Sequence, residues 1–244
     1  MPHDDETTSS SSPGTVALND EEGVRRILAD MVFGLWTTIN NLTRLRPSRN
    51  ERFRVTVFGS ARPASDNWVY GEVKHLAREL AVLGCDIVTG GGPGLMQAAN
   101  EGANEAGTAE GNIGIRVQLP FEQAINPFVK QAFEHQTFFS RLHHFVLVSD
   151  AFVVVPGGIG TTLETLMVWQ LLQVRHLHDV PLVLVGPMWR GLVDWAEGTM
   201  LRPGFELASP EDVRIPTCVD TAEEAIALLR ERHDAWRADG ENPA

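Results

Sequence analysis

The stretch AFVVVPGGIGTTLE, residues 151–164, decides the fold of this chain. Its first five residues form an apolar, valine-rich run that predicts a buried strand. A proline and glycines follow at once, and they predict a sharp turn at the end of that strand. From Thr161 to Val174 the apolar residues recur with helical spacing. A strand, a glycine turn and a helix in this order are typical of a parallel sheet covered by helices.

The same pattern recurs along the chain and predicts the rest of the sheet. Further strands are expected at residues 54–63 with a break at Gly59 and Ser60, and at 85–89, 112–119, 181–186 and 218–219. Helices are expected at residues 67–83, 95–106, 138–149, in the tryptophan-bearing segment after 186, and at 221–237. A linker with Pro120 and Pro127 precedes residue 138. We predict an α/β fold, a Rossmann-like doubly wound parallel sheet with helices on both faces and an N-terminal helical extension.

Three regions are predicted along the chain. Residues 1–19 are acidic and rich in serine, which is typical of a disordered tail. Residues 20–50 are predicted to hold a helix before the main fold, whose apolar stripe either covers the core or meets a second subunit. Residues 51–240 are predicted to form a single Rossmann-like domain.

The composition disfavours several classes of partner and location. The formal net charge is −12 at pH 7, so we expect no nucleic-acid partner and no anionic membrane surface. Neither a signal peptide nor an apolar run long enough to span a membrane is expected. Only two cysteines, Cys85 and Cys218, occur, and a reducing cytoplasm is the expected location. We expect no metal site, because HExxH and CxxC spacings are absent from the sequence.

Glycines at the ends of three predicted strands indicate where a ligand binds. They lie in FGS (58–60), TGGGPG (89–94) and PGGIGT (156–161). Ligands of such sheets bind at the carboxyl ends of the strands, and the N-terminus of a helix favours a phosphate there. Neither a GxGxxG fingerprint nor a GxxxxGK[ST] loop is present. A mononucleotide or a sugar phosphate is therefore the expected ligand.

The same residues also admit a purely structural interpretation. Thr161 and Glu164 have the spacing of a capping box, in which both side chains bond the first amides of their own helix. In that case Glu164 has no chemical role. The sequence alone leaves both interpretations open.

Three motifs together resemble the LOG family, the cytokinin riboside 5′-monophosphate phosphoribohydrolases. They are GGGPGLMQAANEGA (90–103), the arginine of FFSRLHHF (138–145), and PGGIGTTLETLMVWQ (156–170). The resemblance covers roughly residues 54–200, and the family signature PGGxGTxxE is matched at every fixed position. Members of this family are often labelled lysine decarboxylases.

The resemblance implies a site and an assembly. The family's catalytic pair falls on Arg141 and Glu164. The substrate-binding residues are taken from the family's phosphate loop and the other two glycine turns: Gly157, Gly158, Gly160, Thr161, Gly59, Ser60, Gly91, Gly92 and Met96. The family likeness also implies a homodimer with the active site near the subunit interface.

The residues around Arg141 depart from the family's pattern. That arginine usually stands in MHxRK or FFxRK, whereas Leu142 replaces the lysine here and Phe138 and Phe139 occupy the Met-His positions. This departure bears on substrate preference more than on the reaction.

A pyridoxal cofactor, which the decarboxylase label implies, does not suit the sequence. Such an enzyme anchors its cofactor through a lysine, and this chain has only Lys74 and Lys130, neither of which follows a predicted strand. We therefore expect no cofactor.

The resemblance implies hydrolysis of the N-glycosidic bond of a nucleoside 5′-monophosphate, either AMP or an N6-modified relative such as a cytokinin riboside monophosphate. The products are the free base and ribose 5-phosphate. Two alternatives stay open. One is a non-catalytic protein that binds a nucleotide or a phosphorylated cofactor, as molybdenum-cofactor carriers do. The other is a regulatory nucleotide sensor that assembles through the helix near residues 20–45.

Overall fold

The computed structural model describes residues 16–17, 19–44, 51–107, 111–118 and 124–241. Most of the predicted tail at residues 1–19, and residues 45–50, lie outside the described residues. The chain divides into two units, with the boundary between residues 46 and 47. The first unit contains helix α1 (Glu21–Arg44), on which the large apolar side chains between Ile27 and Leu35 are exposed.

The second unit contains one parallel sheet of seven strands in the order β4-β3-β2-β1-β5-β6-β7. The strands are β1 (Arg54–Phe58), β2 (Asp86–Thr89), β3 (Asn112–Val117), β4 (Gln131–His135), β5 (Ala151–Val154), β6 (Leu182–Val185) and β7 (Thr217–Val219). The helices are α2 (Trp68–Val82), α3 (Leu95–Glu105), α4 (Phe138–Val148), α5 (Ile159–Gln173), α6 (Pro187–Met200), α7 (Pro210–Val213) and α8 (Ala222–Glu241). The predicted doubly wound α/β fold is confirmed.

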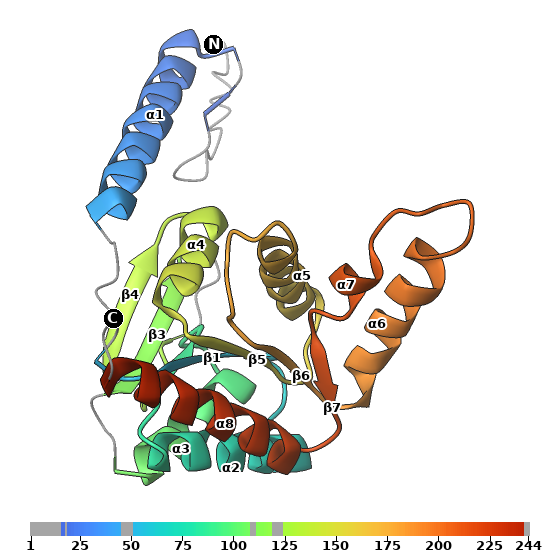
Figure 1. Cartoon of the computed structure of the whole chain (residues 1–244). Helices are drawn as coiled ribbons and strands as arrows, with labels where there is room; N and C mark the ends of the chain where they lie inside the picture. The colour runs from blue at the N-terminus through green and yellow to red at the C-terminus, as the bar shows by residue number, and fades with distance from the viewer. Residues whose placement is uncertain (1–15, 18, 45–50, 108–110, 119–123, 242–244) are drawn as a thin grey trace, which may run out of the picture. The chain divides into compact units, whose positions relative to one another are not determined.

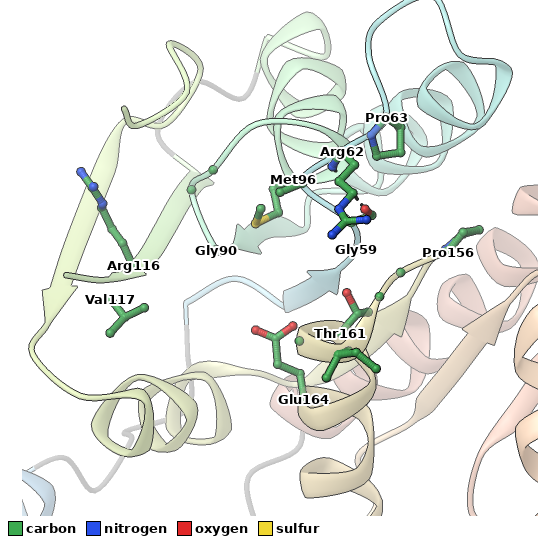
Figure 2. A pocket seen from close by; sticks show the side chains of 18 of the residues that line it. Gly59, Arg62, Pro63, Gly90, Met96, Arg116, Val117, Pro156, Thr161 and Glu164 are labelled. Carbon is green, nitrogen blue, oxygen red and sulfur yellow. Dashed lines mark hydrogen bonds between the residues drawn. The ribbon is translucent and has the colours of Figure 1, made fainter. Parts of the chain in front are cut away.

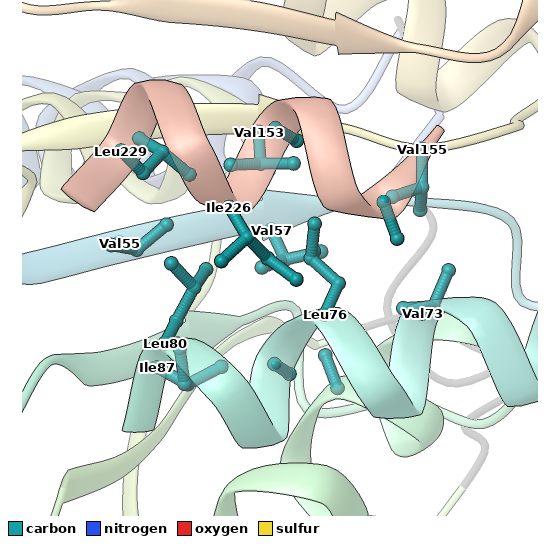
Figure 3. Packing of buried hydrophobic residues seen from close by; sticks show 14 of the residues in the cluster. Val55, Val57, Val73, Leu76, Leu80, Ile87, Val153, Val155, Ile226 and Leu229 are labelled. Carbon is teal, nitrogen blue, oxygen red and sulfur yellow. The ribbon is translucent and has the colours of Figure 1, made fainter. Parts of the chain in front are cut away.

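Helices cover both faces of the sheet, which explains why its central strands read as continuous apolar runs. Helices α2, α3 and α8 lie on one face, and α4, α5 and α6 lie on the other (Figure 1). Side chains alternate between the faces, so that Val55 and Val57 of β1 join the first core while Phe58 joins the second. Figure 3 shows the first core, where Ile226 of α8 and Leu76 of α2 approach β1.

The order of the strands places a switch point between β1 and β5. The chain runs from β1 through β2 and β3 to β4 on one side, then returns to the other side of β1 and adds β5, β6 and β7. β1 and β5 are neighbours, with Val55 opposite Ala151. The segments that follow these two strands therefore diverge at their carboxyl ends and leave a crevice.

Two elements were not predicted. The segment read as a linker contains β4, which pairs with β3 and, among the described strands, with no other. Most of its side chains are exposed, so the segment lacks the apolar run that marks the central strands. The short helix α7 is capped by Ser209 and was missed because a single turn carries no periodic pattern.

Within the described ranges, no helix has both the length and the apolar character needed to cross a bilayer.

The predicted helix 67–83 corresponds to α2, which Asn67 caps by accepting a hydrogen bond from the amide of Val69. Gly84 follows it with a φ of +99°, as expected of a left-handed helix cap.

Candidate active site

A cavity of about 910 Å³ opens at the carboxyl end of the sheet, over the switch point (Figure 2). Its walls come from the segments that follow β1, β2 and β5, from the end of β3, and from the starts of α3, α4, α5 and α6. All the residues predicted for the site line this cavity: Gly59, Ser60, Gly91, Gly92, Met96, Arg141, Gly157, Gly158, Gly160, Thr161 and Glu164. The fold therefore brings together residues that are more than 100 positions apart in the sequence.

The turn between β5 and α5 presents backbone amides to the cavity. Gly158 is the N-cap of α5, and no side chain caps this helix end. The first amides of a helix have no partner within it, and the helix dipole gives this end a partial positive charge. A Cβ atom on Gly157 would overlap the side chain of Thr161, so the turn can close this tightly only with glycine. The turn is thus open to an anion and too tight for a larger residue.

Glu164 does not cap its own helix. The capping-box interpretation of Thr161 and Glu164 is wrong, because α5 begins at Ile159 and its N-cap makes no side-chain hydrogen bond. Glu164 instead lies on the second turn of α5, where Figure 2 shows its carboxyl group directed into the cavity.

Arg141 of α4 holds the carboxyl group of Glu164. Its Nη1 donates to Oε1 of Glu164 at 2.9 Å, and its Nε donates to the carbonyl oxygen of Ile115 at 2.9 Å. Both side chains are largely buried, with exposed fractions of 12% for Arg141 and 11% for Glu164. The guanidinium group also lies 5.1 Å from the ring centre of Phe145. Arg141 is thus fixed on three sides.

Burial raises the pKa of Glu164, and the nearby guanidinium group of Arg141 opposes this shift only in part. A carboxyl group with a raised pKa is a stronger base when it is ionised, and it is held close to the substrate space. Such perturbed groups in a cavity are typical of catalytic sites.

Gly90 makes room for the ion pair, and it was not among the predicted site residues. A Cβ atom at this position would stand 2.5 Å from Nη2 of Arg141 and 2.6 Å from Sδ of Met96. The guanidinium group can therefore pack against the turn only where no side chain projects. The signal was present in the sequence as the first glycine of GGGPG, but nothing local indicated which side chain would approach it.

A buried network of side-chain amides fixes the turn after β2. Oδ1 of Asn100 accepts hydrogen bonds from Thr89 at 2.7 Å and from Asn126 at 3.0 Å. Asn126 also donates from its side chain to the carbonyl oxygen of Gly92 and from its backbone to that of Gly91. Gly91 has a φ of +71°, a conformation that glycine adopts without strain. The network holds Gly91 and Gly92 in the cavity wall.

The turn after β1 is tied to both of the other turns. The amide of Ser60 donates to the carbonyl oxygen of Pro156 at 3.1 Å, and the amide of Leu95 donates to that of Ser60 at 2.8 Å. The three glycine turns therefore form one connected rim around the cavity.

Several lining residues were not predicted to contribute, among them Arg62, Pro63, Arg116, Val117, Phe138 and Met188. Phe138, noted only as a departure from the family pattern, begins α4 beside the cavity. Arg62 and Arg116 lie in segments that follow or end strands, where no local pattern shows that a side chain turns inward.

Fold and site together define a Rossmann-like α/β protein with a buried arginine–glutamate pair at the switch point of its sheet. The chain belongs to the LOG family. The matching family model, described as "Possible lysine decarboxylase", covers residues 96–229.

Several curated relatives match the chain in sequence at low identity. The chain is 31% identical over 159 residues to the probable cytokinin riboside 5′-monophosphate phosphoribohydrolase LOGL3 of Oryza sativa, with 64% of this chain and 73% of the relative covered. It is 28% identical to the cytokinin riboside 5′-monophosphate phosphoribohydrolase of Mycobacterium tuberculosis, with 70% and 90% covered. It is 29% identical to the pyrimidine/purine nucleotide 5′-monophosphate nucleosidase of Escherichia coli K12, with 48% and 28% covered.

Solved structures with this fold include molybdenum-cofactor proteins. The molybdenum cofactor carrier protein of Chlamydomonas reinhardtii superposes with a TM-score of 0.54 at 22% identity, with 75% of this chain and 98% of that chain covered. The molybdenum cofactor binding protein of Rippkaea orientalis superposes with a TM-score of 0.56 at 20% identity, with 75% and 98% covered. At these identities the likeness shows the fold alone.

The residues present do not fit the pyridoxal cofactor that the family description implies. Neither Lys74 nor Lys130 lines the cavity. Nζ of Lys74 forms ion pairs with Glu101 at 2.8 Å and Glu105 at 2.7 Å, between helices α2 and α3. No lysine of the sequence is therefore placed to form a Schiff base at this site.

Proposed function

We propose that this protein hydrolyses the N-glycosidic bond of a nucleoside 5′-monophosphate and releases the free base and ribose 5-phosphate. The observation that carries the proposal is the buried carboxyl group of Glu164, held by Arg141 at 2.9 Å and directed into a cavity. The names of the plant and bacterial relatives support the same reaction class.

The reaction needs an anion close to the sugar carbon C1′. As the bond from C1′ to the base nitrogen breaks, positive charge develops on the ribose ring, and a fixed carboxylate stabilises it. In the proposed mechanism, Glu164 orients a water molecule and accepts its proton while the water oxygen bonds to C1′. The departing base nitrogen takes up a proton from solvent, so the base leaves neutral.

Arg141 is assigned to the positioning of Glu164 and to contact with the sugar. Its guanidinium group is already bonded to Glu164 and to the Ile115 carbonyl, which supports this assignment over direct phosphate binding. The ion pair also lowers the cost of keeping a buried carboxylate ionised next to a negatively charged substrate.

The phosphate is assigned to the turn from Gly157 to Thr161. Its free helix amides and the adjacent helix dipole favour an anion, and C1′ of a nucleotide bound there would face the second turn of α5, which carries Glu164. The base is assigned to the apolar part of the wall, near Met96, Phe138 and Met188. We propose AMP or an N6-modified AMP as substrate, on the names of the cytokinin-related relatives.

The competing function is a carrier that binds a phosphorylated cofactor without cutting it. The solved carrier structures support the fold and not this function, because their identity to the chain is only 20–22%. A carrier also has no need for a buried carboxylate of raised pKa beside the ligand.

We further propose a homodimer in the cytoplasm. The support for a dimer is the family resemblance together with exposed apolar side chains on α4 and α5. Among them are Phe139, Leu163 and the 88%-exposed Ile159, which also lines the cavity. The support for a reducing compartment is that Cys85 and Cys218 are unpaired.

Sedimentation velocity of the wild-type protein should give a dimer, and Leu163→Glu should shift the equilibrium toward monomer. A monomeric wild-type protein would contradict the proposed assembly.

A screen of nucleoside 5′-monophosphates tests the proposed reaction. The purified protein is incubated with AMP, GMP, CMP, UMP and an N6-prenylated AMP, and free base is separated by chromatography. The proposal predicts release of base from at least one of them, with adenine compounds used best. Release from none, together with measurable binding of AMP, would favour the carrier.

A further inference from the structure

The proposed phosphate site has less positive charge than a phosphate monoester has negative charge. A phosphate monoester carries about −1.5 to −2 charges at neutral pH, whereas a helix N-terminus supplies only about +0.5. Arg141 is already engaged by Glu164 and by the Ile115 carbonyl, and Glu164 itself is negative. With the chain as a whole at −12, a further cation is needed close to the α5 turn.

Arg62 lies in the segment that meets this need. It follows β1, the strand next to β5 in the sheet, and neighbouring strands lie about 4.8 Å apart. The bond from the Ser60 amide to the Pro156 carbonyl, at 3.1 Å, joins the β1 turn to the β5 turn. The amide of Arg62 in turn donates to Oγ of Ser60 at 3.2 Å. This bond fixes the start of the arginine side chain beside the turn from Gly157 to Thr161.

The guanidinium group of Arg62 is available for a ligand. Its side chain lines the cavity, and Figure 2 shows it extending from the β1 turn toward the space in front of Thr161. Among the described residues, no carboxylate or carbonyl group is paired with it. The residue is exposed, so its charge carries no desolvation cost before the ligand arrives.

Arg116 also lines the cavity and is not part of the ion pair with Glu164, but it lies too far from the α5 turn to bind a phosphate there. It lies on β3, which β2 and β1 separate from β5. Three strand spacings amount to about 14 Å. Figure 2 accordingly shows it across the cavity from Pro156 and Thr161.

We propose that Arg62 binds the 5′-phosphate from the side opposite the α5 turn and makes the site selective for phosphorylated ligands over free nucleosides. Arginine suits this position because its planar guanidinium group bonds two phosphate oxygens at once. The proposal rests on the proposed function for the identity of the ligand. Its core, a phosphate held between Arg62 and α5, does not depend on turnover.

The test uses Arg62→Gln and Arg62→Lys in the full chain, with Arg230→Gln as the matched control. Arg230 is exposed on α8 and is not part of the cavity wall, so its substitution changes the net charge equally. Binding of ribose 5-phosphate and of AMP is measured by calorimetry, and hydrolysis of AMP and adenosine is measured separately.

Arg62→Gln should weaken binding of both phosphorylated ligands about 10- to 100-fold, as expected for the loss of a charge-assisted hydrogen-bonded pair. The KM for AMP should rise by the same factor while kcat changes less than about threefold. Arg62→Lys should lie between wild type and Arg62→Gln, and Arg230→Gln should match wild type. Any reaction with adenosine should be unaffected by Arg62→Gln.

Arg62 has no role in phosphate binding if Arg62→Gln leaves the affinity for ribose 5-phosphate within about twofold of wild type. The same holds if Arg62→Gln slows the reaction with adenosine as much as the reaction with AMP. Failure of the proposed function gives a different result. In that case wild type binds AMP in an Arg62-dependent way and releases no base. A wild-type protein that binds neither phosphorylated ligand would overturn the phosphate site itself.

Discussion

The carboxyl edge of the sheet, where the strands end, and the amino edge, where they begin, each contain an arginine–carboxylate cluster, and only the first opens onto a cavity. At the carboxyl edge, Arg141 holds Glu164 beside the glycine turns. At the amino edge, Asp86 of β2 lies 2.7 Å from Nε of Arg52 and 3.6 Å from Nε of Arg54. None of these last three residues lines the cavity. An ion pair with a buried carboxylate is therefore not in itself a sign of function.

The difference between the two edges lies in their surroundings. Parallel strands direct their following segments, and with them the N-termini of the next helices, to the carboxyl edge. There the Glu164 carboxyl group has one strong partner and faces open space, and burial raises its pKa. Asp86 instead bridges two arginines next to the start of β1, where Arg54 is its partner in the strand register. The first arrangement suits chemistry and the second suits stability.

The largest effect is expected from Glu164→Gln. This change keeps the shape and an acceptor for Arg141 but removes the charge opposite C1′. Activity toward the best nucleotide found by screening should fall about 10²- to 10³-fold or more, with the thermal midpoint nearly unchanged. Retention of activity within tenfold of wild type would remove Glu164 from the mechanism.

A smaller loss, about 10- to 100-fold, is expected from Arg141→Gln, together with a shift in pH dependence. The reaction requires the Glu164 carboxylate, so activity is lost as pH falls through its pKa. Burial raises that pKa above 4.5 and Arg141 lowers it. Removal of Arg141 should therefore move the acid limb of the kcat/KM profile to higher pH. An unchanged or lower limb would show that the pair does not tune the carboxyl group.

Gly90→Ala should reduce activity about tenfold, because the added methyl group displaces the Arg141 guanidinium from Glu164. Gly71→Ala is the matched control. Gly71 lies in α2, and a Cβ added there would meet no other atom within 4 Å, so this variant should keep full activity and gain about 0.5–1 kcal/mol of stability. Equal activities for the two variants would mean that Arg141 tolerates displacement.

The smallest effect on activity is expected from Asp86→Asn at the amino edge. This change removes the carboxylate shared by Arg52 and Arg54 and should lower the free energy of unfolding by about 1–3 kcal/mol in urea titrations. The kcat/KM should stay within about twofold of wild type at a temperature where the variant is folded. A large loss of activity in the folded variant would show that the amino edge also contributes to the reaction.

Sequence patterns were sufficient for the elements whose signals are local. β1, β2, β5 and β6 are buried on both faces and were marked by apolar runs bounded by glycine or proline. The glycine turns were predicted for the same reason, and they meet around one cavity. β4 was missed because an exposed edge strand needs few apolar residues.

The rest of the site depends on contacts between distant residues. The spacing of Thr161 and Glu164 fits a capping box and a catalytic signature equally well. The structure distinguishes the two, because α5 begins before Thr161 and because Glu164 is bonded by Arg141, 23 positions away in the sequence. The hydrogen bonds of Asn126, the space at Gly90 and the inward direction of Arg62 likewise depend on how the turns pack, and no pattern within one segment encodes that.

A crystal structure of Glu164→Gln with AMP bound would show directly whether the carboxylate position faces the sugar carbon. The 5′-phosphate is expected on the amides of the turn from Gly157 to Thr161, with C1′ facing the side chain at position 164 and space for a water molecule between them. A phosphate bound away from that turn, or C1′ directed away from position 164, would contradict the proposed mechanism.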